Sequence, residues 1–314
     1  MLYVTTREKY DAFTPIRTLQ SDCGADGGLY FPYQMPRFTQ QEIAGLKDRS
    51  FGQVVSEVLN QFFDCQLTAW DVEFAIGRYP VKIQTISQKL LIAELWRNLE
   101  GSYDKLEKQL ADRVRAQFPG ETQKTSWLRI AIGVAVLAGV FSELQRQQML
   151  DPVDISVDEG DFGQVMVLWY ARQMGFPIAN IICGCKDGSA AWELIYNGAL
   201  RDTTAMPELE RLVRSSLGVE EALRFYGASL HGESYILLPQ AHQQLRNGLF
   251  ASVVSQERVD TAIPNVKSTA GYQMDARAAV AYSALLDYRA RTGERRTALL
   301  LGKQDGQKMK ERQI

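Results

Sequence analysis

The sequence predicts an α/β protein with a parallel sheet. Residues 153–183 read as a strand, a glycine turn, a helix and a second strand. The segment RRTALLLG at residues 295–302 reads as a further strand. Between these two segments the apolar residues recur mainly at helical spacing. Two strands joined by one helix form the unit from which parallel sheets are built, so these observations favour the α/β class.

The clearest strand-helix-strand unit is VDISVDEGDFGQVMVLWYARQMGFPIANIIC. Apolar and polar residues alternate over 153–157, as in a strand, and Gly160 and Gly163 make the turn. A helix is predicted over 165–174, and a second strand over 178–183.

Helical patterns account for most of the remaining chain. Residues 83–118 read as one long amphipathic helix or two, with no strand pattern, and their charged second half reads as a solvated face or a connector. WLRIAIGVAVLAGVF at 127–141 reads as a buried helix, because its 15 residues fall short of the roughly 20 that span a bilayer. Four more helices are predicted, over 51–63, 207–217, 219–226 and 276–288.

Composition restricts the classes of function. Lys and Arg total 35 against 37 Asp and Glu, so the net charge of -2 gives no general attraction to nucleic acid or to an anionic membrane. The N-terminus lacks the apolar core of a signal peptide, and four cysteines are too few for a disulfide scaffold, which favours a cytoplasmic protein. Cys183 and Cys185 are expected to be buried thiols, and no metal site is expected.

Several segments, in order, resemble the threonine synthase family. YVTTR at 3–7 and ADGGLYFPYQMP at 25–36 are similar to the family's opening signature, GDFGQVMVLWYARQMGFPI at 160–178 to its glycine loop and following helix, and GYQMDARAAVAYSAL at 271–285 to a later helix. The resemblance implies the tryptophan-synthase-like fold of pyridoxal-phosphate (PLP) enzymes. It also implies a lysine Schiff base with PLP and the conversion of O-phosphohomoserine to threonine and phosphate.

The family's lysine motif falls best on IQTISQKLLIAELWRNL at 83–99. This alignment places Lys89 at the Schiff-base position and Thr85 on the motif's threonine. The turn before the lysine and the aspartate after it are missing. An ordinary lysine on a helix surface is an equally good interpretation of Lys89.

The phosphate loop keeps its glycines but gains acidic residues. Gly160, Phe162 and Gly163 preserve the backbone of a turn whose N–H groups would hold the PLP phosphate at a helix N-terminus. Asp161 replaces the family's asparagine, and Asp158 and Glu159 stand beside it. Because like charges repel, we expect the turn to persist and its affinity for phosphate to be lost. A cation site that includes Asp154 is the alternative, and a solvated acidic loop is the preferred interpretation.

Two further family features are altered. Lys303 aligns with the small hydroxyl residue that meets the pyridine nitrogen, where an ammonium would weaken the electron sink, and Lys308 aligns with a later lysine. Arg277 replaces a histidine. The family's substrate-binding glycine loop has no counterpart, which indicates that most of one βα subdomain is deleted.

These departures predict a truncated sheet and three regions. Residues 1–80 form a threonine synthase-like N-terminal domain, 81–125 a helical connector in place of the deleted subdomain, and 126–314 the remnant of the PLP-type α/β domain. Uncovered sheet edges would favour a homodimer. Glu208, Glu210 and Arg211 are expected to be solvated helix charges.

Two functions remain open at this point. The favoured one is a catalytically degenerate protein that binds a small amino-acid or phosphorylated ligand or serves a structural role. The alternative is a working PLP lyase acting on O-phosphohomoserine or a related small amino acid, with Lys89 as its catalytic residue and the missing loop supplied by a partner chain.

Overall fold

The structure is a computed structural model that describes residues 1–8, 11–149, 151–204 and 206–306. Lys308 lies outside the described residues.

The centre of the fold is a six-stranded sheet in the order β3-β4-β10-β5-β6-β9. All neighbouring strands are parallel except β3 and β4, which are antiparallel. Strands β5 and β6 are joined by helix α7 (Gly163–Gln173), so the predicted parallel unit is confirmed. The strands are β3 (Lys82–Ser87), β4 (Leu90–Glu94), β5 (Val153–Asp158), β6 (Ile178–Cys185), β9 (Leu249–Val253) and β10 (Ala298–Gly302).

The predicted helix over the first part of residues 83–118 is wrong. Residues 82–94 form the β3–β4 hairpin, and only the later part is helical, as α5 (Tyr103–Arg115). All five residues of β4 are buried beside β10, and a strand that is buried on both faces shows no alternation. Such a short apolar run cannot be distinguished from a buried helix by its periodicity, which explains the error.

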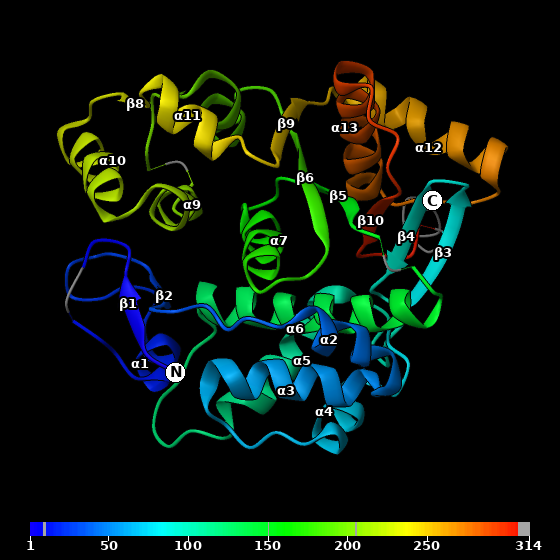
Figure 1. The fold of residues 1–314 in the computed structure, drawn as a ribbon, viewed down its shortest axis with the longest axis horizontal. Helices are drawn as coiled ribbons and strands as arrows, with labels where there is room; N and C mark the ends of the chain where they lie inside the picture. Colours follow the sequence, from blue (N-terminus) through cyan, green and yellow to red (C-terminus); the bar gives the residue numbers. More distant parts are fainter. Residues whose placement is uncertain (9–10, 150, 205, 307–314) are drawn as a thin grey trace, which may run out of the picture.

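Helices cover both faces of the sheet (Figure 1). In β10, Leu299 and Leu301 belong to the core shared with α3, α6 and α7, whereas Ala298 and Leu300 belong to the core shared with α12 and α13. Successive residues of a strand point to opposite faces, so this one strand contributes to two separate cores. The helices named here are α3 (Phe51–Phe63), α6 (Ser126–Arg146), α12 (Gln256–Ala270) and α13 (Ala276–Thr292).

Helix α6 is the central helix of the larger core. It is long and apolar enough to cross a membrane by length and composition, but 89% of its most apolar 18-residue window is buried inside the protein. Two glycines allow close packing: a Cβ added at Gly139 would lie 2.4 Å from the Phe51 ring, and one at Gly133 would lie 2.4 Å from Val167. The prediction of a buried helix is therefore confirmed.

The remaining elements lie on one side of α6 and beyond the β9 edge of the sheet (Figure 1). The N-terminal group is β1 (Tyr3–Thr5), α1 (Pro15–Gln20), β2 (Tyr30–Pro32), α2 (Gln40–Ala44), a 3-10 turn (Gly45–Asp48) and α4 (Ala69–Ile76). The group inserted between β6 and β9 is α8 (Ala190–Trp192), a π-helical turn (Glu193–Asn197), β7 (Ala199–Leu200), α9 (Glu208–Leu217), α10 (Val219–His231), β8 (Tyr235–Ile236) and α11 (Pro239–Leu245).

Candidate functional site

A cavity of about 430 Å³ lies where α5, α6 and α7 meet the carboxyl ends of β5 and β10. This is the edge of a parallel sheet at which α/β proteins commonly bind ligands. Its lining mixes acidic, basic and apolar side chains. The lining residues are Tyr103, Asp104, Glu107, Ser126, Arg129, Ile130, Asp158, Gly160, Asp161, Gly163, Gln164, Val167, Glu208, Arg277 and Lys303.

The glycine turn between β5 and α7 forms one wall of this cavity. Gly160 and Phe162 both adopt the left-handed conformation, with φ of 50° and 68°, and α7 starts at Gly163. The backbone N–H of Gly163 donates to Asp161 Oδ1 at 3.0 Å. The Asp161 carboxylate therefore accepts a hydrogen bond from the first N–H of α7, which a bound anion would otherwise accept.

Each acidic residue of this turn has its own partner. Asp158 accepts from Arg277 Nε at 2.9 Å, and Asp161 pairs with Arg129 Nη1 at 2.8 Å. Glu159 is only 6% exposed and accepts from the Ser189 hydroxyl and from the backbone N–H of Lys186.

The interpretation of this segment as a solvated acidic loop holds only for Asp161, whose side chain is 56% exposed, and is wrong for the buried Glu159. Asp154 is likewise buried and accepts from Asn180 Nδ2 at 2.7 Å. Among the residues that the structure describes, no group of three His, Cys, Asp or Glu is placed to hold a metal ion.

Lys303 lies in the same cavity, directly after β10. It is 8% exposed, and its Nζ lies 5.0 Å from the centroid of the Tyr103 ring. Within the described residues its ammonium group has no hydrogen bond and no ion pair. Burial and, next, the nearby Arg277 lower the pKa of Lys303 to about 8.

Two acidic groups of the cavity have shifted pKa values in opposite directions. Burial acts to raise the pKa of Asp161, but Arg129 and the Gly163 N–H outweigh it and the net pKa is lowered. Burial raises the pKa of Glu107 in spite of Arg129. Asp161 is thus held as a carboxylate, while Glu107 retains a proton to higher pH than a solvated glutamate.

The structure brings together only some of the predicted site residues. Gly160, Asp161, Gly163 and Lys303 line the cavity, and Phe162 is buried behind the turn. Lys89 is exposed in the turn between β3 and β4, outside the cavity lining.

Thr85 is exposed on the edge strand β3. Its position outside the cavity, with that of Lys89, follows from the hairpin that replaces the predicted helix.

Sequence reasoning missed the contribution of α5. The charged pattern of this segment reads as a solvated connector, which is why its role was missed. Tyr103, Asp104 and Glu107 line the cavity from the first turns of α5. One local signal was available: Ser102 precedes the helix and its hydroxyl accepts from the backbone N–H of Lys105, as an N-cap does.

The residues of this cavity do not fit PLP. The Gly163 N–H already donates to Asp161, so this donor at the start of α7 is not free for a phosphate. Lys303 is the only lysine among the described residues that line the cavity, and it follows the strand whose end should meet the pyridine nitrogen.

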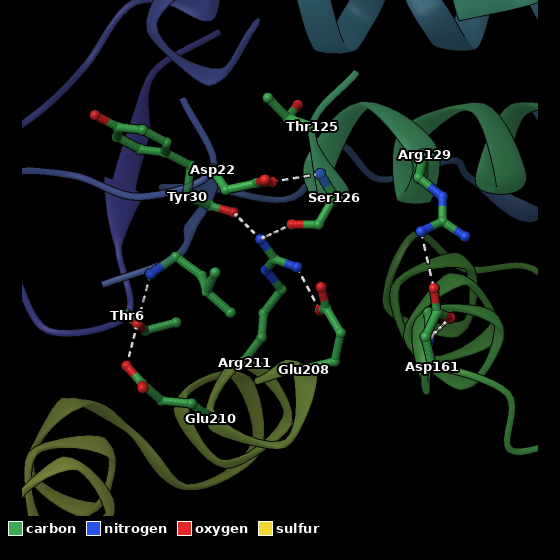
Figure 2. Close-up of polar contacts among 12 residues, drawn as sticks. Thr6, Asp22, Tyr30, Thr125, Ser126, Arg129, Asp161, Glu208, Glu210 and Arg211 are labelled. Atoms are coloured by element: carbon green, nitrogen blue, oxygen red, sulfur yellow. Dashed lines mark hydrogen bonds and ion pairs between the residues drawn. The ribbon is translucent and has the colours of Figure 1, made fainter. Parts of the chain in front are cut away.

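A second polar cluster connects the N-terminal segment to the rest of the fold. Figure 2 shows Arg211 of α9 donating to the carbonyl oxygen of Tyr30 at 2.9 Å and to Ser126 Oγ at 3.2 Å, and pairing with Glu208. Glu210 accepts from the Thr6 hydroxyl.

The prediction that Glu208, Glu210 and Arg211 are solvated is wrong: Arg211 is 0% exposed, and both glutamates are buried. Residues of the N-terminal segment, distant in sequence, cover this face of α9. The local charge pattern of α9 could not show that contact.

The N-terminal region matches a known protein family. The family described as "Threonine synthase N terminus" matches residues 2–78. Threonine synthase-like 1 of Mus musculus is 32% identical over 76 residues, which cover 23% of this chain and 10% of that protein. Threonine synthase-like 1 of Homo sapiens is 27% identical over 177 residues, which cover 50% of this chain and 24% of that protein. The chain thus spans a quarter or less of the length of these curated relatives.

The whole chain has the fold of solved threonine synthases. The PLP-bound threonine synthase of Brucella melitensis superposes with a TM-score of 0.79 at 16% identity, over 99% of this chain and 90% of that one. The yeast enzyme superposes with a TM-score of 0.77 at 14% identity, over 99% of this chain and 88% of that one. The expected α/β fold with a truncated sheet is confirmed.

Proposed function

Because this chain is a divergent relative of the threonine synthases that keeps their fold, we propose that it has lost PLP-dependent lyase chemistry and binds a small amino acid in its cavity. The observation that carries the first half of the proposal is the contact of Asp161 with the Gly163 N–H. Arg129 holds the same carboxylate at 2.8 Å. The Asp161 carboxylate thus takes the position of an external phosphate, and Arg129 balances its charge.

The charges of the cavity support a zwitterionic ligand. Asp104 and Glu107 contribute acidic groups from α5. Lys303, directly after β10, and Arg277, in α13, contribute basic groups. An amino acid carries an ammonium and a carboxylate that can pair with one set each. A ligand with a single net charge would add an uncompensated charge to this partly buried site, which is unfavourable.

The cavity also limits the side chain of the ligand. Ile130 and Val167 supply an apolar part of the lining, next to the ring of Tyr103. A volume of about 430 Å³ suits a ligand of small to moderate size. We therefore propose an amino acid with a small, mainly apolar side chain.

Calorimetric titration with a panel of small amino acids tests this proposal. We expect saturable binding of the free amino acid, and loss of binding for its N-acetyl and carboxamide derivatives, which each lack one charge. Arg277→Gln should weaken binding by roughly tenfold or more, because a hydrogen bond to a charged group contributes about 1.5–3 kcal/mol.

Arg291→Gln is the matched control, since Arg291 lies on the same helix α13 but outside the cavity lining. Equal binding of the blocked and free amino acids would contradict the proposal.

The alternative function is a PLP lyase acting on O-phosphohomoserine or a related small amino acid. The retained glycine turn at the start of α7 favours it. It would require a Schiff-base lysine within the cavity and the release of Asp161 from Gly163 and Arg129. Formation of threonine and phosphate from O-phosphohomoserine by the purified protein would establish this alternative in place of our proposal.

A further inference from the structure

We propose that Lys303 captures a small 2-oxo acid covalently, as an imine, without any cofactor. This inference goes beyond amino-acid binding, because it assigns a chemical reaction to one side chain of the cavity. It rests on the placement of Lys303, its free amino group, and the guanidinium group next to it.

The backbone holds Lys303 in a fixed position at the cavity. The residue directly follows β10, and its carbonyl oxygen accepts from the Tyr103 N–H at 3.3 Å. The next residue, Gln304, donates its N–H to Asp275 at 3.4 Å. Lys303 is thereby tied to the first residue of α5 on one side and to the N-cap of α13 on the other.

The amino group of Lys303 is available for reaction. Its Nζ lies 5.0 Å from the Tyr103 ring centroid and makes no hydrogen bond or ion pair with any described residue. An ammonium that is paired with a carboxylate must first be separated from it before it can react. No such separation is required of this lysine.

Burial of Lys303 favours the neutral amine. Burial makes the largest contribution against the ammonium and Arg277 adds to it, whereas Asp158, Asp161 and Glu107 stabilise the ammonium. The resulting pKa is about 8, so a substantial share of the amine is neutral in mildly alkaline solution. Only the neutral form is a nucleophile.

Arg277 supplies recognition of a carboxylate. Its Nε is bonded to Asp158 at 2.9 Å, while its two terminal nitrogens have no hydrogen bond to the described residues. A Cβ at Gly160 would lie 2.8 Å from Nη2, so the absence of a side chain at that position lets the guanidinium lie against the turn. The free edge of a guanidinium binds a carboxylate with two parallel hydrogen bonds.

The reaction balances without an oxidant or a second substrate. The Nζ lone pair attacks the ketone carbon, the carbonyl oxygen takes up a proton and Nζ releases one, which gives a carbinolamine. A second proton on that oxygen allows it to leave as water while the C=N bond forms, and the loss of the remaining Nζ proton gives the imine. Glu107 lines the same cavity, and burial raises its pKa above that of a solvated glutamate, so it can supply or accept one of these protons.

Borohydride trapping with pyruvate tests the proposal. The full chain is incubated with pyruvate, the imine is reduced with sodium borohydride, and the modified lysine is located by mass spectrometry of peptides. We expect labelling at Lys303 at least tenfold above any other lysine, and its loss in Lys303→Arg. Lys89→Arg removes an exposed lysine and should leave the label at Lys303 unchanged.

Circular dichroism and thermal melting show whether Lys303→Arg is folded. If that variant fails to fold, the pH dependence of labelling in the unmodified chain tests the proposal instead. Half-maximal labelling of Lys303 is expected near pH 8, whereas exposed lysines require a pH near their ordinary pKa of about 10.4. Labelling spread evenly over the lysines, or labelling of Lys303 with the pH profile of an exposed lysine, would overturn the proposal.

The role of Arg277 is tested with a second ketone. Arg277→Gln should lower the labelling of Lys303 by pyruvate roughly tenfold more than its labelling by acetone, which has no carboxylate and responds only to the higher pKa of Lys303. Equal effects on both ketones would overturn carboxylate recognition by Arg277. Amino acids have no carbonyl carbon that can form this imine, so failure of amino-acid binding and failure of imine capture are separate results.

Discussion

At the scale of single residues, Lys303 combines burial with an ionisable group. Its pKa in the folded protein, about 8, lies below the ordinary lysine value of about 10.4. The unfolded chain therefore binds more protons than the folded one between these two pH values, and the contribution of Lys303 to stability rises with pH across that window. Below about pH 8 the full cost of the buried ammonium remains.

Lys303→Met should therefore stabilise the protein at pH 7. The expected gain in the free energy of unfolding is on the order of 2–3 kcal/mol, because one pKa unit corresponds to about 1.4 kcal/mol. The gain should shrink as the pH approaches 10. Urea denaturation at pH 7 and pH 9.5 measures both values, with the exposed Lys89→Met as a control that changes little. A gain that is independent of pH would mean that packing, and not charge, causes it.

Arg211 is a residue whose removal should be costly. Arg211→Met leaves Glu208 buried without its partner and leaves the Tyr30 carbonyl and Ser126 hydroxyl without their donor. Breaking a buried ion pair on one side costs about 3–5 kcal/mol, so we expect a loss of that size in urea denaturation. Arg211→Met combined with Glu208→Leu should recover part of it. A double variant that is less stable than the single one would contradict this explanation.

At the scale of elements, the contact between α3 and α6 depends on a glycine. Gly139→Ala places a Cβ 2.4 Å from the Phe51 ring, so the two helices must separate or the ring must move. Overpacking of this kind costs about 1–3 kcal/mol. Gly227→Ala is the matched control in helix α10: no atom lies within 4 Å of its added Cβ, and it should stabilise the protein by roughly 0.5–1 kcal/mol. Thermal melting of both variants should show shifts of opposite sign.

The elements that could be predicted are those with a clear local period. Strand β5, helix α7, strand β6 and helix α13 all follow their predicted segments, because each shows alternation or an apolar face in the sequence. The β3–β4 hairpin was missed because β4 is buried on both sides and carries no alternation. Contacts between distant segments decide its structure, and no local pattern records them.

The candidate site was predictable only in part for the same reason. The glycine turn at 160–163 is a local feature, and Lys303 was found through its alignment with a family position. Tyr103, Asp104 and Glu107 reach the cavity because α5 begins beside the end of β10, where the Tyr103 N–H donates to the Lys303 carbonyl. That juxtaposition joins residues about 200 positions apart and has no signature in either segment.

At the scale of the whole molecule, the chain keeps the threonine synthase fold around a cavity in which arginine and carboxylate side chains pair with one another. Arginine and carboxylate side chains pair across the position where an external anion would lie. Such pairing lets the turn and the helix ends stay satisfied without a ligand. The homodimer expected from the open sheet edges β3 and β9 stays a prediction, which light scattering of the purified protein would decide.

The most direct measurement of the central claim is a titration of the purified protein with PLP, followed by the absorbance of the Schiff base. We predict no saturable absorbance at cofactor concentrations at which threonine synthases are fully loaded, because Asp161 accepts the hydrogen bond of the Gly163 N–H that a phosphate would need. Saturable absorbance that disappears in Lys303→Arg or in Lys89→Ala would contradict the account and show that the chain is a PLP-binding protein.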